Sequence, residues 1–164
     1  DFNYMMDNVE EFLERIPGRN SITFICTYNN LSITSMDKLL EKILELRTKY
    51  SKTYQRVWFD VPLLRQPAWQ QITMLPEAYQ GIHEDNIKYM QANSGESNGL
   101  HIFKDFEIQK MQRNLAYWRE NADASTQNRK NFYAFFNEHD RRRLTRFLNT
   151  FPEMEEFWEE CRNA

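Results

Sequence analysis

Hydrophobic residues recur along this chain with two different periods, and the changes of period separate predicted helices from predicted strands. The apolar side chains of residues 4–16 fall on one helical stripe, which consists of Met5, Val9, Phe12, Leu13 and Ile16, and Pro17-Gly18 ends it. Residues 21–28 are rich in β-branched and aromatic side chains instead. This composition predicts a strand, which the turn-forming pair Asn29-Asn30 closes.

A second helix and a second strand follow. Thr34 and Asp37 have the spacing of a capping box, and the helix that they open has an apolar face made up of Leu39, Leu40, Ile43, Leu44, Leu46 and Tyr50. Residues 56–61 predict the second strand, which Pro62 stops. A strand, a helix of about four turns and a strand form a βαβ unit, whose two strands run parallel.

The rest of the chain is predicted to be helical. Pro76 opens a helix that extends to about residue 92, and a polar loop over residues 93–99 follows it. Further helices are marked by Ile108, Met111, Leu115 and Trp118, by Phe132, Phe135, Phe136 and His139 after a polar linker at 123–128, and by Phe157, Trp158 and Cys161. Thr150 and Glu153 are the expected capping pair of the last helix, over residues 152–162.

The fold class is therefore α/β: one βαβ unit with parallel strands in residues 1–92, followed by a helical C-terminal region in residues 100–164 that packs on it as part of a single domain. Two parallel strands do not form a stable sheet alone, because parallel sheets are normally buried on both faces and extended by further strands. Either short strands lie within the predicted helices or another copy completes the sheet, and a homodimer is the expected state.

Charge and composition narrow the class of partner. The 164-residue chain has a net charge of -3, so neither nucleic acid nor a membrane is an expected partner. The basic run Arg141-Arg142-Arg143 is balanced by acidic residues near the C-terminus, and both are expected to be solvated helix faces. No apolar run is long enough to span a bilayer and no secretory signal is visible, so a cytoplasmic protein is expected.

The candidate functional residues lie where the predicted strands end, since ligands of parallel α/β units bind beyond the carboxyl ends of the strands. Thr27, Asn29, Asn30, Asp60 and Arg65 could contact a polar ligand there. The alternative is structural: the asparagines form a turn, Asp60 is a cap, and Arg65 pairs with Asp60.

No other residues suggest chemistry. His83, His101 and His139 lie on separate elements without metal-ligand spacing, and His139 is expected to donate a hydrogen bond inside the core. Cys26 reads as a buried core thiol, and nothing in the sequence decides whether it pairs with Cys161. No catalytic or metal site is predicted.

The order of these segments resembles the later part of a radical S-adenosylmethionine enzyme barrel. The likeness rests on residues 22–46, on Val61-Pro62-Leu63-Leu64-Arg65-Gln66-Pro67 and on Ile72-Thr73-Met74-Leu75-Pro76. The ending, with His139-Asp140-Arg141-Arg142-Arg143 and Asn149-Thr150-Phe151-Pro152-Glu153-Met154, is similar to the close of members with a twitch-type C-terminal extension, which are common in phage and marine sequences.

This resemblance implies half of a partial TIM-like barrel, with Asn29, Asn30, Pro62, Leu64 and Arg65 at the positions that contact the cofactor. The CxxxCxxC loop that binds the [4Fe–4S] cluster is absent and would lie upstream of Asp1. The chain alone is therefore expected to be inactive and to hold no cofactor, and S-adenosylmethionine and the cluster require a missing N-terminal barrel half. The alternative is a stand-alone, non-catalytic α/β domain that forms a homodimer and binds a protein or a small molecule.

Overall fold

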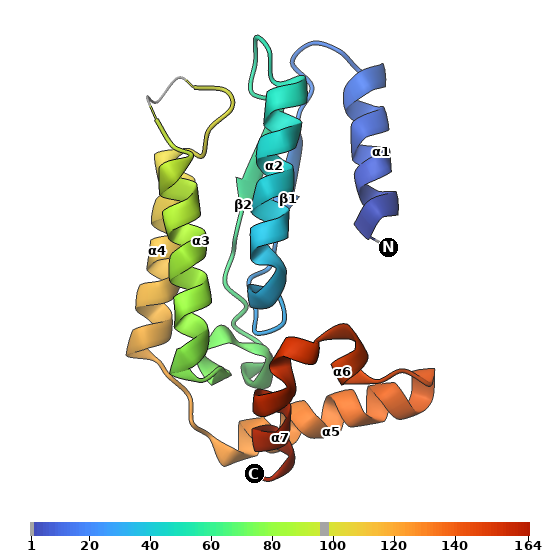
Figure 1. Ribbon diagram of the computed structural model, residues 1–164, viewed down its shortest axis with the longest axis vertical. Coiled ribbons are helices and arrows are strands. Elements are labelled where there is room, and N and C mark those ends of the chain that lie inside the picture. Colours follow the sequence, from blue (N-terminus) through green and yellow to red (C-terminus); the bar gives the residue numbers. More distant parts are fainter. Residues whose placement is uncertain (1, 96–98) are drawn as a thin grey trace. The chain divides into compact units, whose positions relative to one another are not determined.

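The computed structural model describes residues 2–95 and 99–164, and it is mixed α/β and mostly helical, with one two-stranded parallel sheet (Figure 1). The chain divides into two compact units that interleave in sequence. Unit 1 consists of Asp1–Cys26, Ser35–Pro62 and Asp85–Arg113, and unit 2 of Thr27–Thr34, Leu63–Glu84 and Asn114–Ala164.

Unit 1 contains the predicted βαβ arrangement. Its elements in order are α1 (Phe2–Arg15), β1 (Ile22–Ile25), α2 (Met36–Tyr50) and β2 (Val57–Asp60). The strands are parallel and in register from Ile22 opposite Val57 to Ile25 opposite Asp60. The parallel pairing confirms the prediction, although both strands are shorter than the predicted residues 21–28 and 56–61.

The helix α2 packs against β2 through a stripe that matches the predicted one in part. Leu40, Ile43 and Leu46 are buried as predicted, and Met36 and Arg47 are buried as well, whereas the predicted Leu39, Leu44 and Tyr50 are only half-buried. The predicted capping box is also wrong: a 3-10 turn over Ile33–Ser35 leads into the helix, Ser35 is the N-cap, and its side chain forms no capping hydrogen bond.

The helix α1 is amphipathic as predicted, and Leu13 of the predicted stripe is buried. Met6 is buried as well, whereas the predicted Met5 and Ile16 are exposed. A polar network ties α1 to α2 in unit 1. Glu10 accepts hydrogen bonds from Lys42 at 2.9 Å, Lys49 at 2.6 Å and the Tyr50 hydroxyl at 3.0 Å.

Two long helices contribute residues to both units. α3 covers Gln80–Ala92, somewhat later than Pro76 predicts, because a 3-10 turn over Glu77–Tyr79 precedes it. α4 covers Asp105–Glu120 and includes the predicted buried positions Ile108, Met111, Leu115 and Trp118. Shorter 3-10 turns at Ala68–Gln70 and Ile72–Met74 lie in unit 2.

Unit 2 packs its helices around an aromatic cluster. It contains α5 (Thr126–Arg143), α6 (Phe147–Thr150) and α7 (Glu155–Arg162), with a 3-10 turn over Pro152–Met154. The Phe132 ring lies 4.8 Å from that of Phe136, 5.1 Å from that of Phe157 and 5.6 Å from that of Phe147. Such aromatic pairs stabilise a core beyond the area that they bury.

Several predictions for unit 2 need correction. Phe135 is 47% exposed, and the His139 side chain is 39% exposed and lies beside Asp140 rather than in the core. Thr150 and Glu153 do not form a capping pair, because Phe151 is the N-cap of the turn before α7. Phe157, Trp158 and Cys161 are buried as predicted.

The two cysteines are free thiols in different environments. Cys26 is only half-buried, so the prediction of a core thiol is wrong, and Cys161 is buried with a pKa that burial raises to about 12. Within residues 2–95 and 99–164, no helix is both long and apolar enough to cross a membrane.

The strained backbone conformation of Leu144 predicts that a substitution there stabilises the protein. Leu144, the C-cap of α5, has φ 55° and is 94% exposed. Because the left-handed region is costly for residues with a Cβ, Leu144→Gly is expected to raise the free energy of unfolding by about 0.5–1 kcal/mol. Urea unfolding measures the change. Leu144→Ala is the control, and an equal gain there would contradict this explanation.

The environment of the Glu10 carboxylate predicts that the stability of the fold depends on pH. Its hydrogen bonds, above all with Lys49 and then with Lys42, lower its pKa from 4.5 to about 2. A depressed folded-state pKa contributes stability above the unfolded value, and this contribution is lost as pH falls from about 4.5 towards 2. Glu10→Gln is therefore expected to cost about 1–2 kcal/mol at neutral pH and much less near pH 2.

Thermal unfolding across this pH range, compared with Glu11→Gln one residue away, tests the assignment. Glu11 pairs with Arg15 on the exposed side of α1, where its carboxylate is 51% exposed. A loss in Glu10→Gln that is the same at every pH would show that the carboxylate charge does not matter.

Candidate functional site: the uncovered side of the sheet

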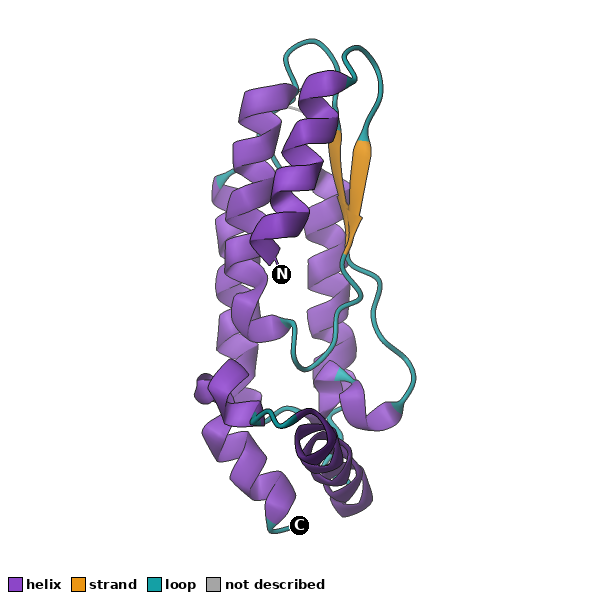
Figure 2. Ribbon diagram, turned by 90° about the vertical axis from the view of Figure 1, so that its right-hand side faces the viewer, coloured by secondary structure: helices purple, strands orange, loops and turns teal. Residues whose placement is uncertain are grey.

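The two faces of the sheet in unit 1 differ in what covers them. Val57 and Phe59 are buried on the face that packs against α2. In Figure 2 the two strands run side by side, and the helix that starts at the label N, α1, lies to one side of them. The opposite face presents Thr23, Ile25, Trp58 and Asp60, of which Ile25 is 66% exposed. We call these four residues the open face.

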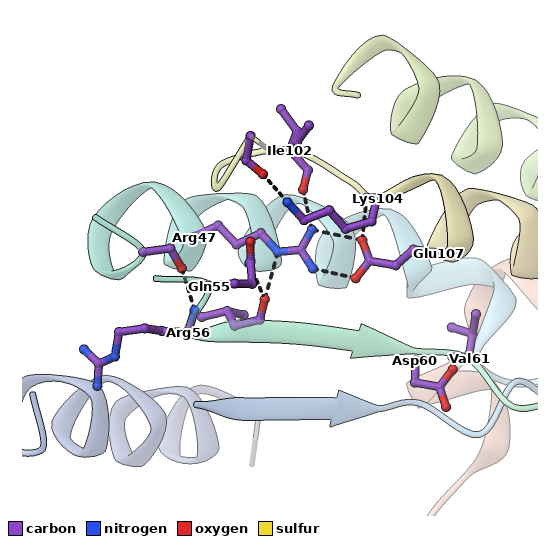
Figure 3. Close-up of polar contacts among 11 residues, drawn as sticks. Arg47, Gln55, Arg56, Asp60, Val61, Ile102, Lys104 and Glu107 are labelled. Carbon is purple, nitrogen blue, oxygen red and sulfur yellow. Dashed lines mark hydrogen bonds and ion pairs between the residues drawn. The ribbon is translucent and has the colours of Figure 1, made fainter. Parts of the chain in front are cut away.

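The two edges of the sheet differ as well. On the outer edge of β2, the Val57 carbonyl accepts a hydrogen bond from Arg47 Nε at 3.0 Å and another from Gln55 Nε2 at 2.7 Å (Figure 3). In β1, Ile22 and Cys26 donate to β2, so the alternation of a parallel strand directs the backbone groups of Thr23 and Ile25 to the other edge. That edge has no partner strand among the described residues.

Arg47 belongs to a buried ion pair that fixes the start of α4 beside β2. Its guanidinium donates to Glu107 at 2.6 and 3.0 Å and to the Ile102 carbonyl at 2.6 Å, and both charged side chains are fully buried. Glu107 also accepts from the backbone N–H of Lys104 at 2.8 Å. A bidentate pair with its remaining donors and acceptors satisfied is the arrangement that makes burial of two charges tolerable.

A groove lies next to Trp58. It has a volume of about 560 Å³, and its lining includes Trp58, Leu100, Ile102, Phe103 and Phe106 with Gln55, Lys104, Asp105 and Gln109. The Phe106 side chain is 51% exposed. The open face therefore continues into an aromatic surface, a type of surface enriched in binding sites.

Charged groups mark the border of this surface. Lys110 of α4 pairs with Asp60 at the end of β2. Because Asp60 has Lys110 as its ion-pair partner, the expectation that Arg65 fills this role is wrong.

Lys104, at the groove, has a pKa that burial lowers, and the positive charge of Arg47 lowers it further.

The predicted residues after β1 mainly build a turn. Asn29 Oδ1 accepts from the Leu31 N–H at 2.8 Å, and its side-chain amide donates to the Thr27 carbonyl at 3.0 Å. Asn30 is completely buried and donates to the Trp69 carbonyl at 3.1 Å. These contacts belong to the structural alternative that the sequence left open.

The predicted residues after β2 have similar roles. Leu64 donates its N–H to the Tyr28 carbonyl at 2.9 Å, extending the parallel pairing into unit 2 as an isolated bridge between Tyr28 and Leu63. The Arg65 guanidinium lies 4.0 Å from the ring centre of Tyr117. Pro62 is half-buried and ends the strand segment in unit 1. Thr27, Asn29, Asn30, Leu64 and Arg65 fall in unit 2, whereas Asp60 and Pro62 fall in unit 1.

Sequence reasoning missed two groups of polar residues. Arg47 and Glu107 lie on the apolar stripes of their helices, four residues from Ile43 and from Met111 respectively, and this position is the signal that could have found them. In unit 2, the fully buried Tyr28 and His83 are hydrogen-bonded to each other beside the buried Trp118.

The residues of this chain do not fit a [4Fe–4S] cluster, because its two cysteines are isolated and lie in different units. In the part of the chain that the structure describes, no three His, Cys, Asp or Glu side chains come together as metal ligands. Comparisons with protein-family models, curated proteins and solved structures find no match to this chain.

The buried pair predicts strong coupling between Arg47 and Glu107. Glu107→Leu leaves a buried guanidinium without its counter-ion and is expected to cost about 3–5 kcal/mol. The double variant Arg47→Met/Glu107→Leu removes both charges, so it is expected to lose less stability than the single variant. Urea unfolding measures the losses in Glu107→Leu, in Arg47→Met and in the double variant, with Arg113→Met, an exposed arginine of the same helix as Glu107, as the control.

Additive losses in the double-mutant cycle would contradict this coupling, because independent residues give no interaction energy.

Proposed function

We propose that this chain is the C-terminal part of a radical S-adenosylmethionine-like enzyme, which contributes one wall of a partial barrel and is not competent alone. The observation that carries this proposal is the asymmetry of the sheet edges. Arg47 and Gln55 both donate hydrogen bonds to the Val57 carbonyl on the outer edge of β2, whereas the outer edge of β1 has no partner strand among the described residues. This asymmetry favours growth of the sheet on the side of β1.

The order of elements supports growth in that direction. Consecutive strands of a parallel sheet are usually neighbours, so a strand that precedes β1 in sequence would pair with its free edge. The helix α1 lies between such a strand and β1 and contacts α2, as the crossover helix of a preceding βα repeat would. The open face, with Thr23, Ile25, Trp58 and Asp60, would then face the barrel interior.

The role of the chain in this enzyme would be to bind and orient. The cluster and S-adenosylmethionine would supply the radical chemistry, and the protein would supply position and shielding. Asn29 already closes a turn, Asn30 is completely buried against the Trp69 carbonyl, and Arg65 lies over the Tyr117 ring. Contacts with the cofactor from this region would therefore come from the backbone or from the exposed parts of Asn29 and Arg65.

The test is activity that depends on an added segment. A longer chain that includes a CxxxCxxC loop before Asp1, reconstituted with iron and sulfide under reducing conditions, is expected to cleave S-adenosylmethionine to 5′-deoxyadenosine. Ile25→Lys should abolish this activity by burying a charge in the completed sheet. The control is Ile82→Lys, at a second exposed isoleucine, which is 38% exposed. Activity retained in Ile25→Lys would contradict the assembly proposed here.

A second candidate is a stand-alone, non-catalytic domain that forms a homodimer, and the composition of β1 favours it. Residues 22–27 contain no charge and no proline, the features that usually prevent edge strands from pairing. Two copies could join β1 to β1 across a two-fold axis, which makes the new pair antiparallel. Light scattering would then give a dimer mass for the chain alone, and Ile25→Lys would give a monomer.

A further inference from the structure

A second pocket in unit 1 lies where α1 ends and where the segment from α2 to β2 begins. It has a volume of about 390 Å³ and is lined on one side by Glu14 and Gly18 and on the other by Lys49, Lys52, Tyr54 and Arg56. This volume is within the range of about 300–1,000 Å³ of small-molecule sites. The pocket lies before the first residues of both strands, at the end opposite to the predicted site residues.

Arg56 is a buried cation in this pocket without a carboxylate partner in the described part of the chain. It is 8% exposed, and its guanidinium donates to the Leu13 carbonyl at 2.8 Å and to the Ile16 and Asn20 carbonyls. A guanidinium has five N–H groups, so these three bonds leave donors over. The negative end of the α1 dipole offsets part of its charge, but a helix end carries only about half a unit charge.

Lys52 adds a second cation. Its ammonium donates to the Thr48 carbonyl at 2.9 Å, which satisfies one of its three N–H donors. Lys49 lines the same pocket, but its ammonium forms ion pairs with the carboxylates of Glu10 at 2.6 Å and Glu14 at 3.5 Å, which offset its charge. Within a chain of net charge -3, the pocket therefore has an excess of positive charge on Arg56 and Lys52.

Hydrogen bonds fix the backbone of the segment that forms one wall of the pocket. The Ser51 hydroxyl accepts from the Arg56 N–H at 3.0 Å, and His101 Nε2 is hydrogen-bonded to the Ser51 carbonyl at 2.8 Å. Gly18 has φ 88°, and no heavy atom lies within 4 Å of the position that a Cβ would take. The segment that carries Lys52 and Arg56 is thus held at its start and at its end, which lowers the entropic cost of binding.

We propose that this pocket binds a small oxyanion, a phosphate or carboxylate group, between Arg56 and Lys52. The planar fork of an arginine matches two oxygens of such a group, and the lysine adds a point charge. Tyr54, whose 41% exposed ring lies under the Arg19 guanidinium at 4.8 Å, would flank the rest of the ligand. Binding here does not depend on what completes the sheet, because all of these residues belong to unit 1.

The test is calorimetric titration of the full chain with inorganic phosphate and, separately, with acetate at constant ionic strength. Saturable binding is expected, and Lys52→Gln is expected to weaken it about tenfold. Lys38→Gln, on the exposed side of α2, removes the same charge elsewhere and should leave binding unchanged. Binding of phosphate alone would identify a phosphate site, and binding of acetate alone a carboxylate site.

Absence of saturable binding with both ions would overturn the proposal. An equal loss in Lys52→Gln and Lys38→Gln would also overturn it, since it would indicate a response to net charge alone. Circular dichroism of each variant checks folding. Arg56→Lys, which keeps the charge but loses the planar fork, should reduce affinity even in a variant that is fully folded.

Discussion

The buried ion pair between Arg47 and Glu107 joins α2 to three other segments of unit 1: β2, α4 and the loop before α4. One guanidinium binds the carboxylate from α4, the Val57 carbonyl from β2 and the Ile102 carbonyl from the loop before α4. Burial of both charges is costly, and only this full set of hydrogen bonds offsets the cost. The same guanidinium also donates to the Val57 carbonyl on the outer edge of β2, which disfavours extension of the sheet on that side.

This constraint gives the sheet a direction. One face of the sheet packs against α2 and the Val57 carbonyl of β2 is occupied, whereas among the described residues the outer edge of β1 has no partner strand and Ile25 on the open face is exposed. An uncharged strand edge next to exposed apolar side chains is the surface that a sheet normally covers. In the first proposed function an upstream segment covers this surface, and in the second a second copy of the chain covers it.

Much of unit 1 could be predicted from the sequence, because its signals are local. The β-branched and aromatic residues of β1 and β2, and the apolar stripe between them, specify a parallel βαβ unit. The burial of Arg47 could not be predicted from its own helix, since the guanidinium has an acceptable environment only when Glu107, sixty residues later, lies opposite it. Tertiary contacts of this kind decide burial where the local pattern allows two answers.

The strand ends illustrate the same limit. Polar residues after parallel strands often contact ligands, which is why Asn29, Asn30 and Arg65 are candidates, but asparagines also have structural roles. Asn29 forms local turn bonds to Thr27 and Leu31, and Asn30 donates to the Trp69 carbonyl, thirty-nine residues later. In unit 2, the aromatic residues of α5 predicted a buried stripe, yet only Phe132 is fully buried because α6 and α7 cover one side of that helix. Which side of a helix is covered depends on elements that lie far along the chain.

The central claim is that the sheet is completed at β1, and amide hydrogen exchange of Thr23 and Ile25 tests it most directly. Measured by NMR on the chain alone at a dilution that keeps it monomeric, both amides should exchange rapidly, whereas those of Ile22 and Cys26, which bond to β2, should be protected. In the completed assembly, with an upstream segment or a second copy, Thr23 and Ile25 should become protected as well. Exchange at these two amides that stays rapid in every assembly would contradict the account.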